Sequence, residues 1–99
     1  MKLKIVLCLA ASVMAATSAH AASDSCKKIS ALAGQAMTAR QDGELLQDSL
    51  EKIGDGSKFA QSVVLKAYDR QVQPLKAMKE DAVKEFQNEA FRACFDANS

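Results

Sequence analysis

The sequence predicts an all-α protein, a small up-down four-helix bundle with one disulfide. Apolar residues recur at helical spacing through residues 22–73, with no proline and without the sustained alternation that is typical of a strand. Two cysteines, Cys26 and Cys94, lie near opposite ends of the segment that we expect to be the mature chain. The periodicity predicts the helices, and the cysteine pair predicts that a disulfide joins the first helix to the last.

Residues 1–21 have the order of a secretory signal peptide. Two lysines precede an apolar run over residues 5–16, and a small-residue Ala-His-Ala segment ending at Ala21 follows it. That run of about a dozen residues is shorter than the roughly 20 that a membrane-spanning helix needs. We therefore expect cleavage after Ala21, a helical domain over residues 22–99 with no membrane span, and a periplasmic or secreted location.

Processing would leave two cysteines, Cys26 and Cys94, because Cys8 lies in the leader. Export favours disulfide formation, and two cysteines allow a single intramolecular pairing. Intermolecular pairing and free thiols are the alternatives. A chain this short buries little surface, and closing this loop would contribute roughly 4 kcal/mol of stability in the chain-entropy model.

The first predicted helix begins at Ser23 or Asp24, either of which can cap it, and ends at Gly43. Its predicted inward face holds Cys26, Ile29, Leu32, Ala33, Ala36 and Met37. Its predicted outward side holds Lys27, Lys28, Ser30, Gln35 and Gln41. A short second helix is expected over residues 44–53, with apolar residues at positions 46, 50 and 53.

Ser57 is the predicted cap of a third helix that runs to about Arg70. We expect this helix to be the most enclosed, because apolar residues surround much of it: Phe59, Ala60, Val63, Val64, Leu65, Ala67 and Tyr68. Pro74 suits the first turn of a fourth helix that extends to about Ala97. Its predicted inward residues are Leu75, Met78, Ala82, Val83, Phe86, Ala90, Ala93 and Cys94.

The disulfide would fix the arrangement of these helices. Cys26 opens the first helix and Cys94 closes the last, so bonding them makes these two helices antiparallel. Short turns at Gly43 and at residues 54–56 would let the middle helices pack as a hairpin, which gives up-down connectivity. A three-helix protein with a frayed second helix is the alternative.

Composition excludes several kinds of function. Loss of the two leader lysines would change the formal net charge from +1 to −1, which argues against nucleic-acid binding. The single histidine, His20, also lies in the leader, so catalytic triads and histidine metal sites are excluded from the mature chain. We predict no catalytic residue, no metal and no cofactor.

Three aromatic residues are the candidates for a partner-binding surface. Tyr68 is the only tyrosine, and we expect its ring at the edge of the core with its hydroxyl reaching water. Phe91 and Phe95 are one turn apart, to the side of the apolar stripe of the last helix. They either close the core beside the disulfide or form an exposed patch of the kind that binds proteins.

A set of residues in a particular order is spread over most of the mature segment: Cys26, Ile29, Leu32-Ala33, Met37-x-Ala39-Arg40-Gln41-x-Gly43, Val64, Ala67-Tyr68, Ala82, Phe86-x-Asn88 and Cys94. This pattern resembles a family of small exported proteobacterial and prophage-borne proteins of unknown function. The segment from Pro74 onward lacks the aromatic-rich lead into the last helix that we associate with that family. The resemblance implies a helical periplasmic protein and assigns no functional residue.

The leading hypothesis is therefore a non-enzymatic periplasmic interaction module, acting as inhibitor, adaptor or phage-exclusion factor on another periplasmic or cell-envelope protein. The alternative is an acid-stress periplasmic chaperone. In architecture alone the chain is similar to such chaperones and to the phage exclusion protein spackle, which are also small, exported, helical and singly disulfide-bonded.

Overall fold

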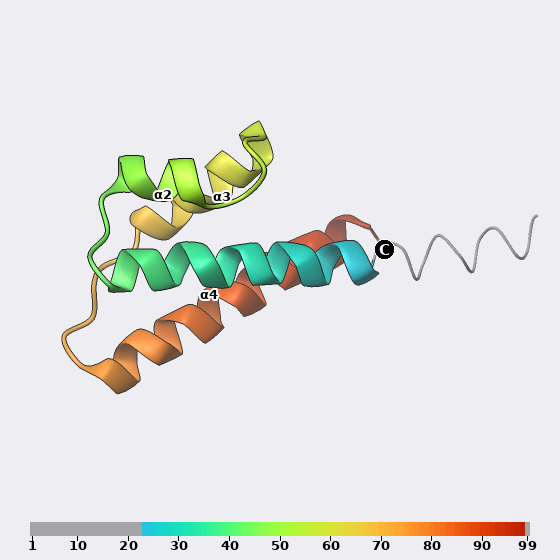
Figure 1. The fold of residues 1–99 in the computed structure, drawn as a ribbon. Coiled ribbons are helices and arrows are strands. Elements are labelled where there is room, and N and C mark those ends of the chain that lie inside the picture. The colour runs from blue at the N-terminus through green and yellow to red at the C-terminus, as the bar shows by residue number, and fades with distance from the viewer. Residues whose placement is uncertain (1–22, 99) are drawn as a thin grey trace, which may run out of the picture.

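The computed structural model describes residues 23–98 (Figure 1). This part of the chain forms four helices and no strand: a first helix over residues 23–41, then α2 (Leu46–Lys52), α3 (Lys58–Tyr68) and α4 (Lys76–Ala97). The all-α prediction is confirmed. The predicted leader lies outside the described residues, and none of the described helices is long and apolar enough to cross a membrane.

The first helix ends as predicted, at a glycine. Gly43 has φ +81°, and the amides of Gly43 and Glu44 donate to the carbonyls of Arg40 and Ala39 at 3.1 and 3.0 Å. These two hydrogen bonds form a Schellman motif, which satisfies carbonyl groups at the end of the helix. The motif needs a residue with positive φ, and glycine adopts such a φ without steric cost. The predicted inward face is buried at Cys26, but Gln41, predicted outward, is only 2% exposed.

The turn from α2 to α3 follows the predicted chemistry. The hydroxyl of Ser57 accepts a hydrogen bond from the amide of Ala60 at 3.1 Å, so Ser57 caps α3. The carboxylate of Asp55 accepts from the amide of Ser57 at 3.0 Å, which fixes the approach to the helix. The second helix is shorter than predicted, because residues 44 and 45 precede it and Ile53 follows it as C-cap.

The third helix is less enclosed than predicted. Ala60, Val63, Val64 and Ala67 are buried on one face, whereas Phe59 and Leu65 are 54% and 47% exposed. The helix also ends at Tyr68 and not at Arg70. Its apolar residues therefore extend beyond the face that the core covers.

The fourth helix differs most from prediction. It begins at Lys76, so Pro74 lies in the preceding linker and not in the first turn. Phe86 is its one buried residue among those described, and Leu75, at the N-cap, and Met78 are 62% and 42% exposed although we predicted both inward. The N-terminal part of α4 thus contributes little to the core.

The helices are arranged around the first one (Figure 1). α4 runs antiparallel to it, and α2 and α3 form a hairpin on another side. One core joins the first helix, α3 and α4 and consists of Ala33, Ala36, Met37, Val63, Val64, Ala67 and Phe86. Partly buried residues pack against it: Leu32, Leu46, Leu50, Ile53, Tyr68, Ala82, Val83 and Ala90.

Candidate functional site

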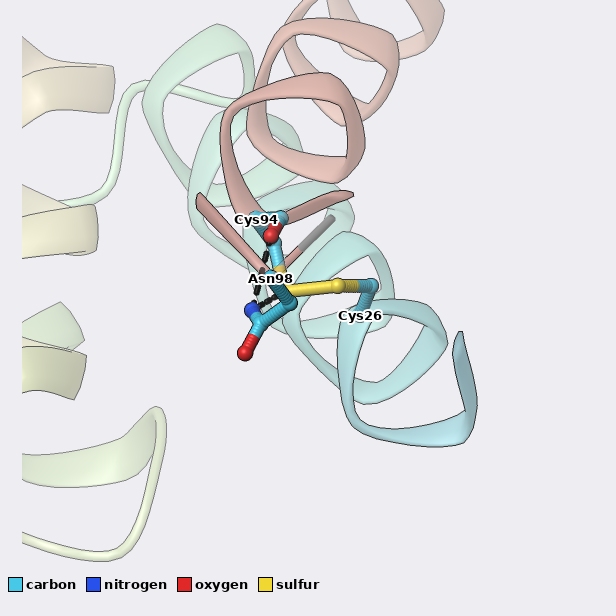
Figure 2. Close-up of a disulfide and its surroundings, with 3 residues drawn as sticks. All are labelled: Cys26, Cys94 and Asn98. Atoms are coloured by element: carbon cyan, nitrogen blue, oxygen red, sulfur yellow. Dashed lines mark hydrogen bonds between the residues drawn. A yellow bond between two sulfur atoms is a disulfide. The ribbon is translucent and has the colours of Figure 1, made fainter. Parts of the chain in front are cut away.

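The disulfide is present between the two predicted cysteines. Cys26 and Cys94 are bonded with 5.5 Å between their Cα atoms, and the bond ties the start of the first helix to the last turn of α4. Figure 2 shows Asn98 folded against this bond, where its side-chain amide donates to the carbonyl of Cys94 at 2.8 Å. Asn98 therefore satisfies a carbonyl that the helix end leaves without an intrahelical partner.

An apolar groove of about 490 Å³ lies beside the disulfide, between α3 and the C-terminal half of α4. The residues that line it are Ile29, Phe59, Ser62, Val63, Lys66, Arg70, Phe86, Glu89, Ala90, Ala93, Cys94, Ala97 and Asn98. α4 presents alanines at positions 90, 93 and 97, three and four residues apart, which places them on one side of the helix. Because these side chains are small, α4 leaves open space next to α3.

The charged residues of the groove gather at one end. Arg70 and Glu89 form an ion pair across it, and the Arg70 guanidinium lies 5.4 Å from the centre of the Phe86 ring. The hydrogen bond to Glu89 raises the pKa of Arg70 above its ordinary value, so Arg70 stays charged. The ammonium of Lys66 has no ion-pair or hydrogen-bond partner among residues 23–98.

The Phe91 and Phe95 rings form a stacked pair with centres 6.1 Å apart. Phe91 is half-buried, whereas Phe95 is 51% exposed. Neither ring lines the groove, so the pair lies on another side of α4. Phe95 thus has the exposure expected of a surface residue, and its ring stacks on that of the less exposed Phe91.

Tyr68 lies far from that pair, at the end of the molecule where α3 leads into the linker. Its hydroxyl donates to the carbonyl of Glu44 at 2.7 Å and accepts from the hydroxyl of buried Ser49 at 2.6 Å. The guanidinium of Arg40 lies 5.4 Å from the centre of its ring. The core-edge position is as predicted, and the hydroxyl makes two hydrogen bonds within the protein that we did not predict.

Gln41 is the buried polar residue that we did not predict. Its side-chain amide donates to the carbonyl of Gln71 at 2.9 Å and accepts from the amide of Gln73 at 2.8 Å. It follows Met37 by four residues, a spacing that places both on the same side of the helix and would have indicated burial. Gln41 therefore ties the linker between α3 and α4 to the first helix.

The described residues contain no group of three or more side chains suited to bind a metal ion. The fold and these surfaces together define a class: a small helical protein closed by one disulfide, with an apolar groove and, on another side of α4, an aromatic pair of which Phe95 is exposed. No family model, no curated protein and no solved structure matches the chain.

Proposed function

We propose that this chain is a non-enzymatic periplasmic protein-interaction module that acts as an inhibitor, adaptor or phage-exclusion factor. The observation that carries the proposal is the stacked Phe91 and Phe95 pair, with Phe95 51% exposed. Adjacent apolar side chains that form an exposed patch often mark a binding surface, and aromatic anchors supply much of the binding energy at protein interfaces. The proposed partner is another protein of the periplasm or cell envelope.

The position of the pair favours tight binding. Phe95 directly follows Cys94, whose disulfide ties this turn of α4 to the first helix. A helix end normally frays, and a partner would then have to order it at a cost in free energy. The covalent bond limits that cost, because the rings are already held on one segment.

The proposal includes the finer topology, an up-down order of the four helices. It is supported by the antiparallel first helix and α4 and by the α2–α3 hairpin in Figure 1. In this order the loops alternate between the two ends of the molecule. The disulfide and the aromatic pair then share one end, away from the Gln41 linker.

Site-specific photocrosslinking tests the proposed function. The crosslinking residue p-benzoylphenylalanine replaces Phe95 in the exported protein, and Leu65, which is 47% exposed on α3, is replaced in the control. We expect one defined protein adduct from position 95 and none from position 65. In a titration with that protein, Phe95→Ala should weaken binding by about tenfold or more, and Leu65→Ala should not.

Absence of an adduct at position 95, or equal adducts at both positions, would contradict the proposal. Melting temperature separates binding from folding. Because Phe95 is 51% exposed, Phe95→Ala should lower the melting temperature little, so a large loss of stability would assign the ring to the core instead.

An acid-stress chaperone is the second candidate, and the exposed apolar side chains favour it. Beyond Phe95 they are Leu45, Phe59, Leu65, Val72, Leu75 and Met78. Aggregation of a client protein near pH 3 tests this function, and a client that aggregates equally with and without the chain would exclude it.

A further inference from the structure

The groove beside the disulfide has the size and lining of a site for a small molecule. Its volume of about 490 Å³ falls within the roughly 300–1,000 Å³ that is common for ligand sites. Phe86 and Val63 are buried at the base of the groove, and the apolar surface that water still reaches comes from the exposed residues Phe59, Ala93 and Ala97. Such a surface gains free energy when an apolar ligand removes it from water.

The two ends of the groove differ in polarity. Arg70 pairs with Glu89 at the end near the C-terminus of α3, and Lys66 lies one turn before Arg70 on the same side. The other end is lined by Phe59 and by the last alanines of α4. One end is therefore charged and the other apolar.

Among the residues that line the groove, Lys66, Arg70 and Glu89 give the polar end a net positive charge. Arg70 pairs with Glu89, and two further carboxylates, Asp69 and Glu85, lie near Arg70 without lining the groove. Lys66 forms no ion pair among the described residues, so its ammonium can pair with an anionic group. The lining offers no cation at the opposite end, near Ala97.

The lining offers few hydrogen bonds to a peptide. The hydroxyl of Ser62 donates to the carbonyl of Phe59 at 2.7 Å, and the amide of Asn98 donates to the carbonyl of Cys94 at 2.8 Å. A peptide backbone laid in the groove would find these donors already used, and unpaired backbone groups cost free energy. A hydrocarbon chain needs no such partners.

We propose that this groove binds a single-chain amphiphile with an anionic head group, such as a long-chain carboxylate. The head group lies beside Lys66, and the hydrocarbon chain extends along Val63 and Phe86 toward Phe59 and Ala93. This site is separate from the Phe91 and Phe95 surface, so it does not depend on the proposed protein interaction.

Three probes with the same tail test the proposal by calorimetric titration below their micelle-forming concentrations: dodecanoate, dodecanol and dodecyltrimethylammonium. We expect dodecanoate to bind most tightly and the cation most weakly. Lys66→Gln should weaken the binding of dodecanoate by about fivefold and leave the affinity for dodecanol unchanged. Lys58→Gln is the matched control, because Lys58 is exposed on the same helix and does not line the groove.

A second variant tests the position of the tail. Ala93 is exposed, so Ala93→Phe can fill the apolar end without entering the core, and it should abolish binding of dodecanoate and dodecanol. The proposal is overturned if dodecanoate does not bind saturably. It is overturned as well if Lys66→Gln lowers the affinity for dodecanol as much as that for dodecanoate, or if Ala93→Phe leaves the binding of both probes intact. It is also overturned if the free protein is a dimer that Ala93→Phe dissociates, since the occupant is then a second copy.

Discussion

The two ends of the molecule are held together by different means. At one end a single covalent bond joins Cys26 to Cys94, and the surrounding surface is open, with an exposed Phe95 and a groove. At the other end the described residues form no covalent cross-link, and Gln41 and Tyr68 make hydrogen bonds to backbone carbonyls and amides.

This difference follows from how much each segment buries. α3 buries four of its 11 residues, whereas α4 buries one of 22. A helix that buries so little apolar surface gains little stability from packing. We conclude that the disulfide replaces packing at the C-terminal half of α4, which leaves the side chains there available for binding.

The largest expected effect on stability comes from removing the disulfide. Cys26→Ser combined with Cys94→Ser should lower the free energy of unfolding by about 4 kcal/mol, because it releases a cross-link between residues 68 positions apart. Urea unfolding measures this loss. Reduced wild-type protein is the matched control and should match the double variant. A loss below about 1 kcal/mol would mean that packing holds this end after all.

The next effect comes from the hydrogen-bonded end. Gln41→Ala should cost about 2–3 kcal/mol, since it leaves the carbonyl of Gln71 and the amide of Gln73 without their partner. Gln35→Ala is the control, because Gln35 is exposed on the same helix and should change stability by less than about 0.5 kcal/mol. Equal effects in the two variants, measured by urea unfolding, would show that the linker does not depend on Gln41.

A smaller effect is expected at Tyr68. Tyr68→Phe removes the bonds to the Glu44 carbonyl and the Ser49 hydroxyl and should cost about 1–2 kcal/mol. A double-mutant cycle with Ser49→Ala should give a coupling energy of at least about 0.5 kcal/mol. Strict additivity of the two substitutions would argue against the shared bond.

The smallest effect is a pH dependence in the turn before α3. The side-chain and backbone hydrogen bonds of Ser57 lower the pKa of Asp55 below its ordinary value. A lowered folded-state pKa gives stability that is present above about pH 4 and is lost as the pH falls through the folded-state pKa. Asp55→Asn should therefore be less stable than wild type at pH 7, and the difference in melting temperature should vanish in acid. A difference that is constant with pH would contradict this.

The sequence was sufficient to predict what depends on local geometry. The helical periodicity predicted the all-α fold, Ser57 predicted the start of a helix, and Gly43 predicted the end of another. These predictions hold because helix caps and positive φ values depend on residues that are neighbours in the sequence. The cysteine pairing was predictable because only one intramolecular combination was expected to remain after processing.

The linker and the groove were not predictable in this way. Gln41 bonds to residues 30 and 32 positions later in the chain, and no local pattern encodes such a partner. These bonds tie residues 71 and 73 to the first helix, and α4 begins after Pro74, at Lys76. The groove arises only when the alanines of α4 lie next to the polar edge of α3, which depends on how two distant helices pack.

Hydrogen exchange after reduction tests the central claim most directly. The claim is that the disulfide, and not side-chain packing, holds the C-terminal half of α4 on the first helix. We predict that, in reduced protein, the amides of residues 90–97 lose nearly all protection, whereas those of Val63, Val64 and Ala67, which are buried in α3, keep a measurable part of theirs. Equal protection in the two segments after reduction would contradict the claim.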